Sequence, residues 1–401
     1  MAKKQNNIKF CLWTHIQNEA SIIEDMIESA VDYVDYIVLV DNGSTDGTQD
    51  IVRNYFKKID VPAVLYENPN GWTNPGVNRQ QAWDYLCQTD HKCDYILRID
   101  ADEIIKIDDS FDWTFFEKQN PDSYDVIFSN GGYCIPRTWI WNFHVKWKWR
   151  DDEAHEEIVL DVDNVEDEES YSRVILPYSF RHEAGKGAGH SHENPVKYHE
   201  DVLKFELQML RRLQEGSNIH RERYYLFYLC RSFNYGAHDI DEEHAYDLFP
   251  YGKHDVIQFL KKGIYYYERF IDTFVHRPDW FIFYFKSQLH ERLHDYEGQI
   301  KLLERSYNDN PLRAEPIHDL FWAAKRSENL TSAIKWGRLL KAKKLDIERD
   351  PYDVETYKYY EHNASLRAAV DEVLINEPPP PCRTFKFESV TLKENGLLSL
   401  A

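Results

Sequence analysis

Apolar runs alternate with helical spacing along the first hundred residues. Residues 8–13 and 36–40 are short apolar runs of the kind that forms buried strands, and the apolar positions between them recur at helical spacing. A second helical pattern, a strand at 63–67 and a helix near 76–88 precede the stretch "CDYILRIDADE". This alternation predicts a mostly parallel sheet with helices on both faces. Ligands of such sheets bind at the carboxyl ends of the strands.

Between residues 125 and 160 the pattern changes to aromatic-rich strands. In "NFHVKWKWR" the residues Phe143, Val145, Trp147 and Trp149 alternate with polar ones, so one strand face is predicted to be buried and the other wet. The two tryptophans are therefore expected in the core. Stacking on a bound ligand ring is the alternative role for them.

Helical patterns dominate the second half of the chain. Residues 181–195, with three glycines and three histidines, predict a flexible loop, and nearly everything beyond it is helical. An offset of 34 residues aligns Tyr296 with Leu330 and Ile300 with Ile334. Since this is the tetratricopeptide period, we expect helix pairs that stack to bury faces neither could bury alone.

The length of 401 residues favours two domains. We expect an α/β domain at 1–200 and an all-α helical-repeat domain at 201–375, then a Pro-rich break and tail at 376–401 that begins with "EPPPPCR". The repeats could bind a substrate, or a second copy of the chain to give a homodimer through the helical domain.

The charge balance restricts the partners. Lys and Arg number 48 against 69 Asp and Glu, a net charge of −21, which repels nucleic acid and anionic membranes. The six cysteines are scattered without zinc-site spacing, and no stretch approaches eighteen continuous apolar residues. These features predict a soluble, cytoplasmic protein that binds no nucleic acid and has no integral membrane span.

Two polar turns carry the chemistry. Asp41 and Asn42 directly follow the strand at 36–40, where their side chains can hydrogen-bond a base or ribose. Alternatively this is only a well-capped turn. The next three polar residues can cap the following helix: Ser44, Thr45 and Asp46.

The second turn, Asp100-Ala101-Asp102, directly follows the strand "YILRI". Two carboxylates spaced in this way (a DxD motif) can face one hard cation, which prefers oxygen ligands. The alternative is a solvated acidic turn, since such turns are common in acidic chains.

Four segments, each at a strand end or helix start, resemble the family 2 glycosyltransferases with the GT-A (nucleotide-diphospho-sugar transferase) fold: "THIQNEASIIEDMI", "VLVDNGSTDGT", "GVNRQQA" and "LRIDADE". The resemblance covers roughly residues 8–105. It continues through "DDEAHEEIVL", "YSFRHEAG" and "VKYHEDVLKFELQML", which look like members with a tetratricopeptide-like tail, a subgroup that includes bacteriocin S-glycosyltransferases.

The resemblance implies a role for each residue near the nucleotide. Asp41 and Asn42 would lie by the base, and Glu19 on the ribose side of the pocket. Arg79 would match a family arginine that is usually followed by Asn, where this chain has Gln80.

The resemblance also implies a metal site for Mn²⁺ or Mg²⁺. Asp102 would ligate the metal directly, and Asp100 would touch ribose or a metal-bound water. A histidine from beyond the core sheet would complete the shell. His182 is the first candidate, and the alternatives are His155, His190 and His192.

An inverting transfer needs a general base that takes the acceptor's proton. The resemblance selects Glu156, with Asp151 and Asp152 as competitors. The family segment reads more like Gly-x-Val-His-Glu, whereas this chain has "RDDEAHEE", so Glu157 also stays open.

Together these implications describe a metal-dependent inverting glycosyltransferase. It would move a hexose from a nucleotide-diphospho-sugar donor to a glycan, protein, peptide or lipid acceptor. One alternative is a nucleotide-binding interaction protein with a helical-repeat partner surface. The other is a sugar nucleotidyltransferase, but "LWTHIQNEAS" lacks the glycine and the cation that a triphosphate loop needs.

Overall fold

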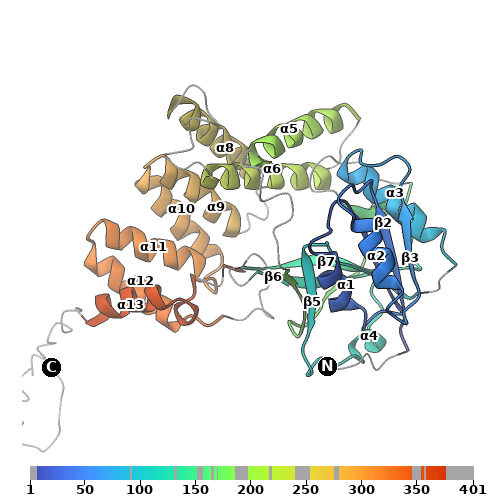
Figure 1. Cartoon of the computed structure of the whole chain (residues 1–401). Helices are drawn as coiled ribbons and strands as arrows, with labels where there is room; N and C mark the ends of the chain where they lie inside the picture. Colours follow the sequence, from blue (N-terminus) through green and yellow to red (C-terminus); the bar gives the residue numbers. More distant parts are fainter. Residues whose placement is uncertain are drawn as a thin grey trace, which may run out of the picture.

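The computed structural model describes residues 7–90, 93–130, 133–150, 157–163, 167–168, 170–185, 197–215, 219–239, 253–274, 280–345, 354–355 and 358–375. An α/β domain comes first in the chain, and a group of helices lies beside it (Figure 1). The Pro-rich break and tail expected at 376–401 lie outside the described residues.

The first half of the α/β domain confirms the predicted alternation of strands and helices. Four parallel strands lie in the order β3-β2-β1-β4. The elements are β1 (Phe10–Ile16), α1 (Ile23–Ala30), β2 (Tyr36–Asp41), α2 (Thr48–Phe56), β3 (Ala63–Glu67), α3 (Pro75–Cys87) and β4 (Tyr95–Arg98).

The second half makes the sheet mixed, not mostly parallel as expected. Strand β7 pairs antiparallel with both β4 and β6, and β11 runs parallel to β6 but antiparallel to β5. The elements are β5 (Glu103–Ile107), α4 (Phe115–Lys118), β6 (Ser123–Ser129), β7 (Tyr133–Asn142), β10 (Arg173–Ile175) and β11 (Phe180–Ala184), with β8 (Trp147–Trp149) and β9 (Ile158–Leu160) as a separate pair. The β6–β7 hairpin breaks the parallel pattern because a tight connection reverses the chain.

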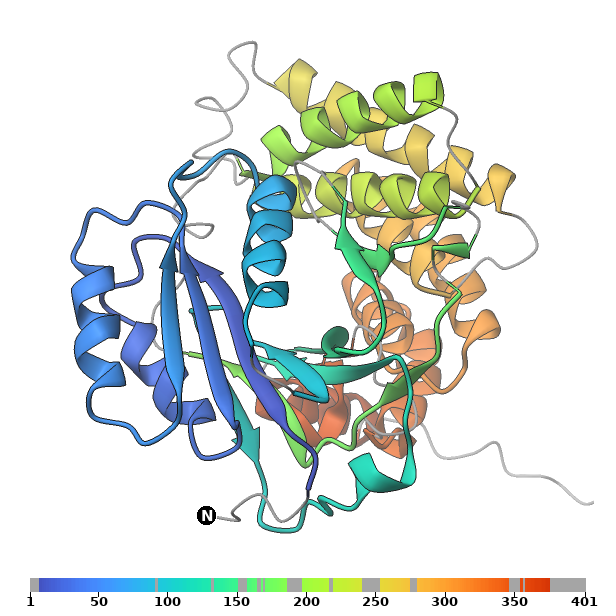
Figure 2. The same cartoon turned by 90° about the vertical axis from the view of Figure 1, so that its right-hand side faces the viewer.

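Strand β1 divides the core between the two faces of the sheet. Phe10 and Leu12 pack with α1, whereas Cys11 and Trp13 pack on the opposite side with α3. Figure 2 shows α1 and α2 on one side of the strands and α3 on the other. The alternation follows from the two-residue period of a strand.

Two expectations about local structure were wrong in part. The strand expected from residue 143 begins only at Trp147, because a turn closed by the Val145 N–H and the Asn142 carbonyl (3.2 Å) comes first. Trp147 and Trp149 are buried as predicted. Within the expected loop at 181–195, residues up to Ala184 form strand β11.

The helical part confirms the repeat. Helices α10 and α12 begin at Tyr296 and Leu330, each capped by the preceding side chain, Asp295 or Asn329. The helices are α5 (Lys197–Glu215), α6 (Ile219–Asp239), α8 (Lys253–Thr273), α9 (Trp280–Arg292), α10 (Tyr296–Asp309), α11 (Glu315–Arg326), α12 (Leu330–Ala342) and α13 (Ala364–Ile375), with a 3₁₀ turn at Tyr360–His362. Among the helices described, none is both long and apolar enough to cross a membrane.

A short strand joins the two parts of the chain. β12 (Val354–Glu355) comes from the helical half, yet Val354 pairs antiparallel with Cys134 of β7. Cys134 and Ile127 also belong to the apolar core of the helices. The expectation that this half is purely helical therefore missed one strand, and the helical half shares backbone and core contacts with the sheet.

A buried ion pair lies beside this junction. Arg313 donates to Glu315 through Nη2 (2.7 Å) and Nε (3.0 Å), and both side chains are almost completely buried. The Glu355 N–H donates to the same carboxylate (3.0 Å). Burial raises the pKa of Glu315, and the Arg313 charge opposes that rise.

Replacing Glu315 by Gln should destabilise the protein strongly, because it leaves the Arg313 charge buried without its carboxylate. We expect a loss of about 3–5 kcal/mol in the free energy of unfolding. Urea unfolding followed by circular dichroism measures it. Glu297→Gln, which removes an exposed pair with Lys301 in α10, is the control and should leave the free energy of unfolding nearly unchanged. Equal losses of stability in the two variants would contradict a structural role for the buried Arg313–Glu315 pair.

Candidate active site

The turn after β2 is built around the Asp41 carboxylate, which is fully buried. Its Oδ1 accepts hydrogen bonds from the N–H groups of Gly43 and Ser44, both at 3.0 Å, and from Gln49 Nε2 at 2.6 Å. Its Oδ2 has no hydrogen-bond partner among the described residues. A buried acceptor in this state needs a donor from water or from a ligand.

Three residues were expected to cap α2, and one of them contributes. Gly47 is the N-cap, and Asp46 Oδ1 accepts from the Thr48 N–H at 3.0 Å. The other two bind Asn18: Ser44 Oγ accepts from the Asn18 N–H, and the Thr45 N–H donates to Asn18 Oδ1, both at 2.8 Å. These bonds fix the loop that carries Glu19, whose own N–H donates to Thr48 Oγ1 at 2.8 Å.

Asn42 is the centre of an amide network. Its Oδ1 accepts from Asn68 Nδ2 (3.0 Å) and Asn78 Nδ2 (3.1 Å), and its Nδ2 lies 3.0 Å from His15 Nδ1. The His15 ring stacks on Trp72, with ring centroids 6.0 Å apart. Because both polar atoms of Asn42 already have partners, the residue ties together four segments of the chain.

Arg79 reaches this network from α3. Its Nε donates to His15 Nε2 at 3.1 Å, and its guanidinium lies 5.2 Å from the Trp149 ring centroid. Burial lowers the pKa of Arg79, and the neighbouring Arg98 charge lowers it further. Gln80, which stands where the family usually has Asn, accepts from the Trp149 N–H at 2.6 Å and so fixes β8 against α3.

The acidic turn after β4 is surrounded by positive charge. Asp100 forms an ion pair with Arg98. Burial alone would raise the pKa of Asp100, but the charges of Arg98, Arg79 and Arg137 hold it well below its usual value. Asp100 is therefore ionised at neutral pH.

Strand β11 ends against the backbone of Asp102. The Gly185 N–H donates to the Asp102 carbonyl oxygen at 2.7 Å, and a Cβ at residue 185 would lie only 2.9 Å from the same oxygen. The two segments can approach this closely because residue 185 has no side chain.

His182, from β11, is 1% exposed and packs edge-on against Trp139 with centroids 4.7 Å apart. Its Nδ1 lies 3.4 Å from Glu103 Oε2, while Glu103 Oε1 accepts from Arg137 Nη1 at 2.9 Å. Burial, helped by the Arg137 charge, lowers the pKa of His182 to about 3. The imidazole is thus neutral, which is the form that ligates metals.

Asp100, Asp102 and His182 are the residues predicted to hold a divalent cation. Within the part of the chain that the structure describes, no three His, Cys, Asp or Glu side chains group together in a way that could hold a metal. Mg²⁺-type ions, however, usually need only one or two carboxylates and complete their shell with substrate phosphates. Both ring nitrogens of His182 also lack hydrogen-bond partners among the described residues.

The candidates for the base follow β8 in the sequence. Asp151, Asp152 and Glu156 lie outside the described residues, as do the alternative metal ligands His155, His190 and His192. Glu157 is described, and its carboxylate forms an ion pair with the buried Arg150.

Sequence reasoning missed several residues at this site. Arg98 carried a usable signal, because it is the single charge in β4 and stands two residues before Asp100. Arg137 and Trp139 carried no such signal in the sequence, because only the pairing of β7 with β4 brings them to this turn.

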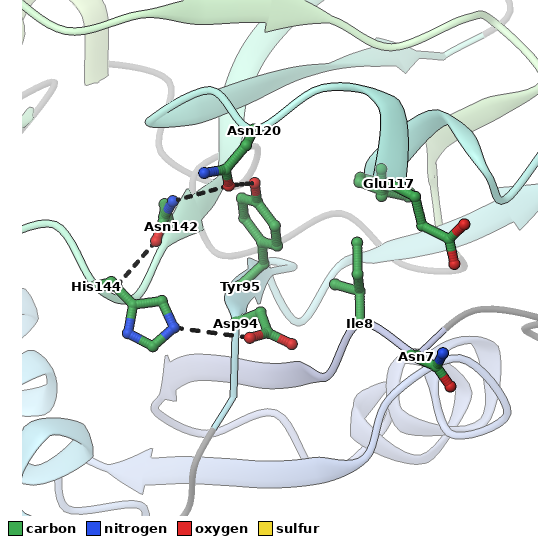
Figure 3. A pocket seen from close by; sticks show the side chains of 9 residues that line it. Asn7, Ile8, Asp94, Tyr95, Glu117, Asn120, Asn142 and His144 are labelled. Carbon is green, nitrogen blue, oxygen red and sulfur yellow. Dashed lines mark hydrogen bonds and ion pairs between the residues drawn. The ribbon is translucent and has the colours of Figure 1, made fainter.

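A separate cavity of about 360 Å³ lies near the opposite end of β4 (Figure 3). Tyr95 and Asn142 both bond Asn120 in its wall, and Asp94 faces His144. Since Asp94 precedes β4 and Asp100 follows it, this cavity is distinct from the acidic turn.

The family model described as "Glycosyl transferase family 2" matches residues 14–153. These residues form a family 2 glycosyltransferase domain. The chain is therefore a glycosyltransferase, with a GT-A-like domain followed by tetratricopeptide-like helices. None of the curated proteins matches the sequence.

Three solved structures show weak similarity to this chain. Residues 1–349 of S. aureus TarS are 15% identical, with 75% of this chain and 91% of that chain covered at a TM-score of 0.35. Mannosyltransferase PcManGT from Pyrobaculum calidifontis, in complex with GDP-Man and Mn²⁺, is 13% identical, with 66% and 81% covered at a TM-score of 0.37. YrrB, a TPR protein with an unusual peptide-binding site, is 14% identical, with 47% and 90% covered at a TM-score of 0.21.

Gly185→Ala should weaken the acidic turn, because the added Cβ must push the Asp102 backbone away. We expect kcat/KM for donor hydrolysis to fall by about tenfold to a hundredfold, since small displacements of reacting groups have effects of this size. Gly337→Ala in α12, where the Cβ meets only side chains at 3.4 Å or more, is the matched control and should leave the rate unchanged. Equal rates for both variants would contradict the role of this contact.

Proposed function

We propose that the protein is a metal-dependent, inverting hexosyltransferase that uses a nucleotide-diphospho-sugar donor. The observation that carries the proposal is the position of the acidic turn: Asp100 and Asp102 lie directly after β4, at the carboxyl edge of the parallel strands in the family 2 domain. Asp41 ends β2, the second strand over in the same parallel sheet.

The nucleotide would bind between the two turns. The buried Asp41 Oδ2 is an acceptor for a base N–H or a ribose hydroxyl, and Trp72, which is about half exposed, offers a ring face for stacking. The hydrogen bond between Asn78 and Asn42 would hold this side of the nucleotide site in place, and Glu19 lies on the loop beside it.

Asp100, Asp102 and His182 would hold Mn²⁺ or Mg²⁺ together with the donor's phosphate oxygens. When bound, such an ion stabilises the negative charge that develops on the leaving nucleoside diphosphate. Glu103 would orient the His182 ring through its contact with Nδ1.

For the general base, we propose Glu156, with Asp152 and Asp151 as the competing carboxylates. Glu157 is the weakest of the four because its carboxylate is already paired with Arg150. The base would remove the proton from the acceptor nucleophile while the sugar is attacked from the face opposite the leaving group.

The acceptor would be a glycan, a protein, a peptide or a lipid. The stacked helices provide the surface that could bind it or pair two copies of the chain. We also propose that the protein works in the cytoplasm.

Removal of the metal should abolish activity. Donor hydrolysis, screened over a panel of nucleotide sugars, should stop in EDTA and return with Mn²⁺ or Mg²⁺, because the leaving group loses its counter-charge without the ion. Released nucleoside diphosphate is the readout. Full activity in chelator would rule out the metal requirement.

Glu156→Gln should lower the transfer rate by about 10²–10⁴-fold, the usual effect of removing a positioned general base. Nucleoside diphosphate affinity should persist, because donor binding does not use this residue. Asp152→Asn and Asp151→Asn test the competitors in parallel, and Glu157→Gln is the matched control for the paired carboxylate. Near-normal transfer by Glu156→Gln would show that the assignment is wrong, and a joint loss of affinity would assign the residue a structural role.

A further inference from the structure

Four segments of the chain meet at the cavity of about 360 Å³ in Figure 3: the residues before β1, the start of β4, the end of α4 and the end of β7. Asp94 holds three of these segments together. Its Oδ2 accepts from the Lys9 N–H at 2.7 Å, and its carbonyl oxygen accepts from the Phe143 N–H at 2.9 Å. The walls of the cavity are therefore fixed by the backbone.

Two carboxamides in the wall are bonded to their neighbours through oxygen. Asn120 Oδ1 accepts from the Tyr95 hydroxyl at 2.9 Å and lies 3.4 Å from Asn142 Nδ2. Asn142, which is 8% exposed, accepts from the His144 N–H through Oδ1 at 2.9 Å. Since both of these oxygens already have donors, the carboxylates are the acceptors that the cavity offers to a ligand.

The charge of the lining selects a cation. Two carboxylates line the cavity, Asp94 and Glu117, and no Lys or Arg is among the described residues that line it. Asp94 Oδ1 faces His144 Nε2 at 3.6 Å, whereas no hydrogen bond or ion pair joins Glu117 to the other residues drawn in Figure 3. An anion would be repelled here, and the net charge of −21 on the whole chain has the same sign as the lining.

The apolar part of the lining restricts the ligand further. Tyr95 and Phe116 are each 2% exposed, so neither presents a ring face on which a sugar could stack. Together with Ile8 they form an apolar surface of the kind that packs against the methylene groups of Lys and Arg. A guanidinium can bind a carboxylate through two N–H groups and still donate to a second acceptor, which favours Arg.

We propose that this cavity binds an arginine side chain of a protein or peptide acceptor. The inference rests on the proposed function and deepens it, because it selects one class among the possible acceptors. Asp94 and Asp100 are six residues apart. Because a strand rises about 3.3 Å per residue, the cavity lies about 20 Å from the acidic turn. An extended acceptor would need about six or more residues between its arginine and the residue that receives the sugar.

N-acetyl-arginine amide tests the proposal without the donor, the metal or a known acceptor. Ligand-observed NMR titration of the full chain should give saturable binding that weakens as salt rises. The citrulline analogue, which keeps the shape but has no charge, should bind at least several-fold more weakly. Asp94→Asn and Glu117→Gln should each weaken arginine binding by about fivefold, the effect expected for a partly exposed ion pair.

The matched control is Asp60→Asn, which removes the same charge from an exposed side chain outside the cavity. Its affinity for N-acetyl-arginine amide should equal that of the unsubstituted protein, so the control separates the cavity from the overall negative charge. Thermal unfolding of each variant checks the fold. If Asp94→Asn does not fold, Glu117→Gln, a change at an exposed side chain, is the decisive variant.

The two proposals can fail separately. Absence of saturable binding, equal affinity for the citrulline analogue, or unchanged arginine affinity in Glu117→Gln would each overturn the cavity as a site for arginine. If donor hydrolysis with Mn²⁺ then continued, the proposed function would stand without this inference. If instead arginine bound as expected but no nucleotide sugar were hydrolysed, the proposed donor chemistry would fail and the cation site would stand.

Discussion

Strand β7 is the element on which the rest of the structure depends. It lies between β4 and β6, so it connects the parallel half of the sheet to the mixed half. Its middle carries Arg137 and Trp139 to the acidic turn, and Trp141 lies in the core beneath α3. Near its start, Cys134 pairs with the strand from the helical half. One ten-residue strand therefore links both cores and the site.

This arrangement explains how buried charge is tolerated near the acidic turn. Isolated charges cannot be buried without a large loss of solvation energy. Here Arg98 is paired with Asp100, Arg137 with Glu103, and both cations also contact indole rings. The result is a polar site held in a rigid aromatic frame, where charges can act on a ligand with little screening by water.

A buried charge is also paired where the helices contact the sheet, away from the acidic turn. Arg313 and Glu315 are buried together, and the Glu315 carboxylate also accepts a hydrogen bond from the backbone of β12. Because β12 pairs with β7, the helices are attached to the strand that carries Arg137. Helix stacking and site geometry therefore share a structural support.

The sequence by itself determined what local patterns can encode. The alternation of strand and helix patterns predicted β1 to β4 and placed Asp41 and Asp100 at strand ends. The 34-residue offset predicted the matching starts of α10 and α12. Only the tertiary structure decided which distant residues meet. The antiparallel pairing of β7 brings Arg137 to Asp100, β11 brings His182 to Glu103, and β12 joins the sheet. Such contacts depend on strand order and register. The repeating pattern within one segment does not specify them, because they are stabilised by interactions between segments that are far apart in the sequence.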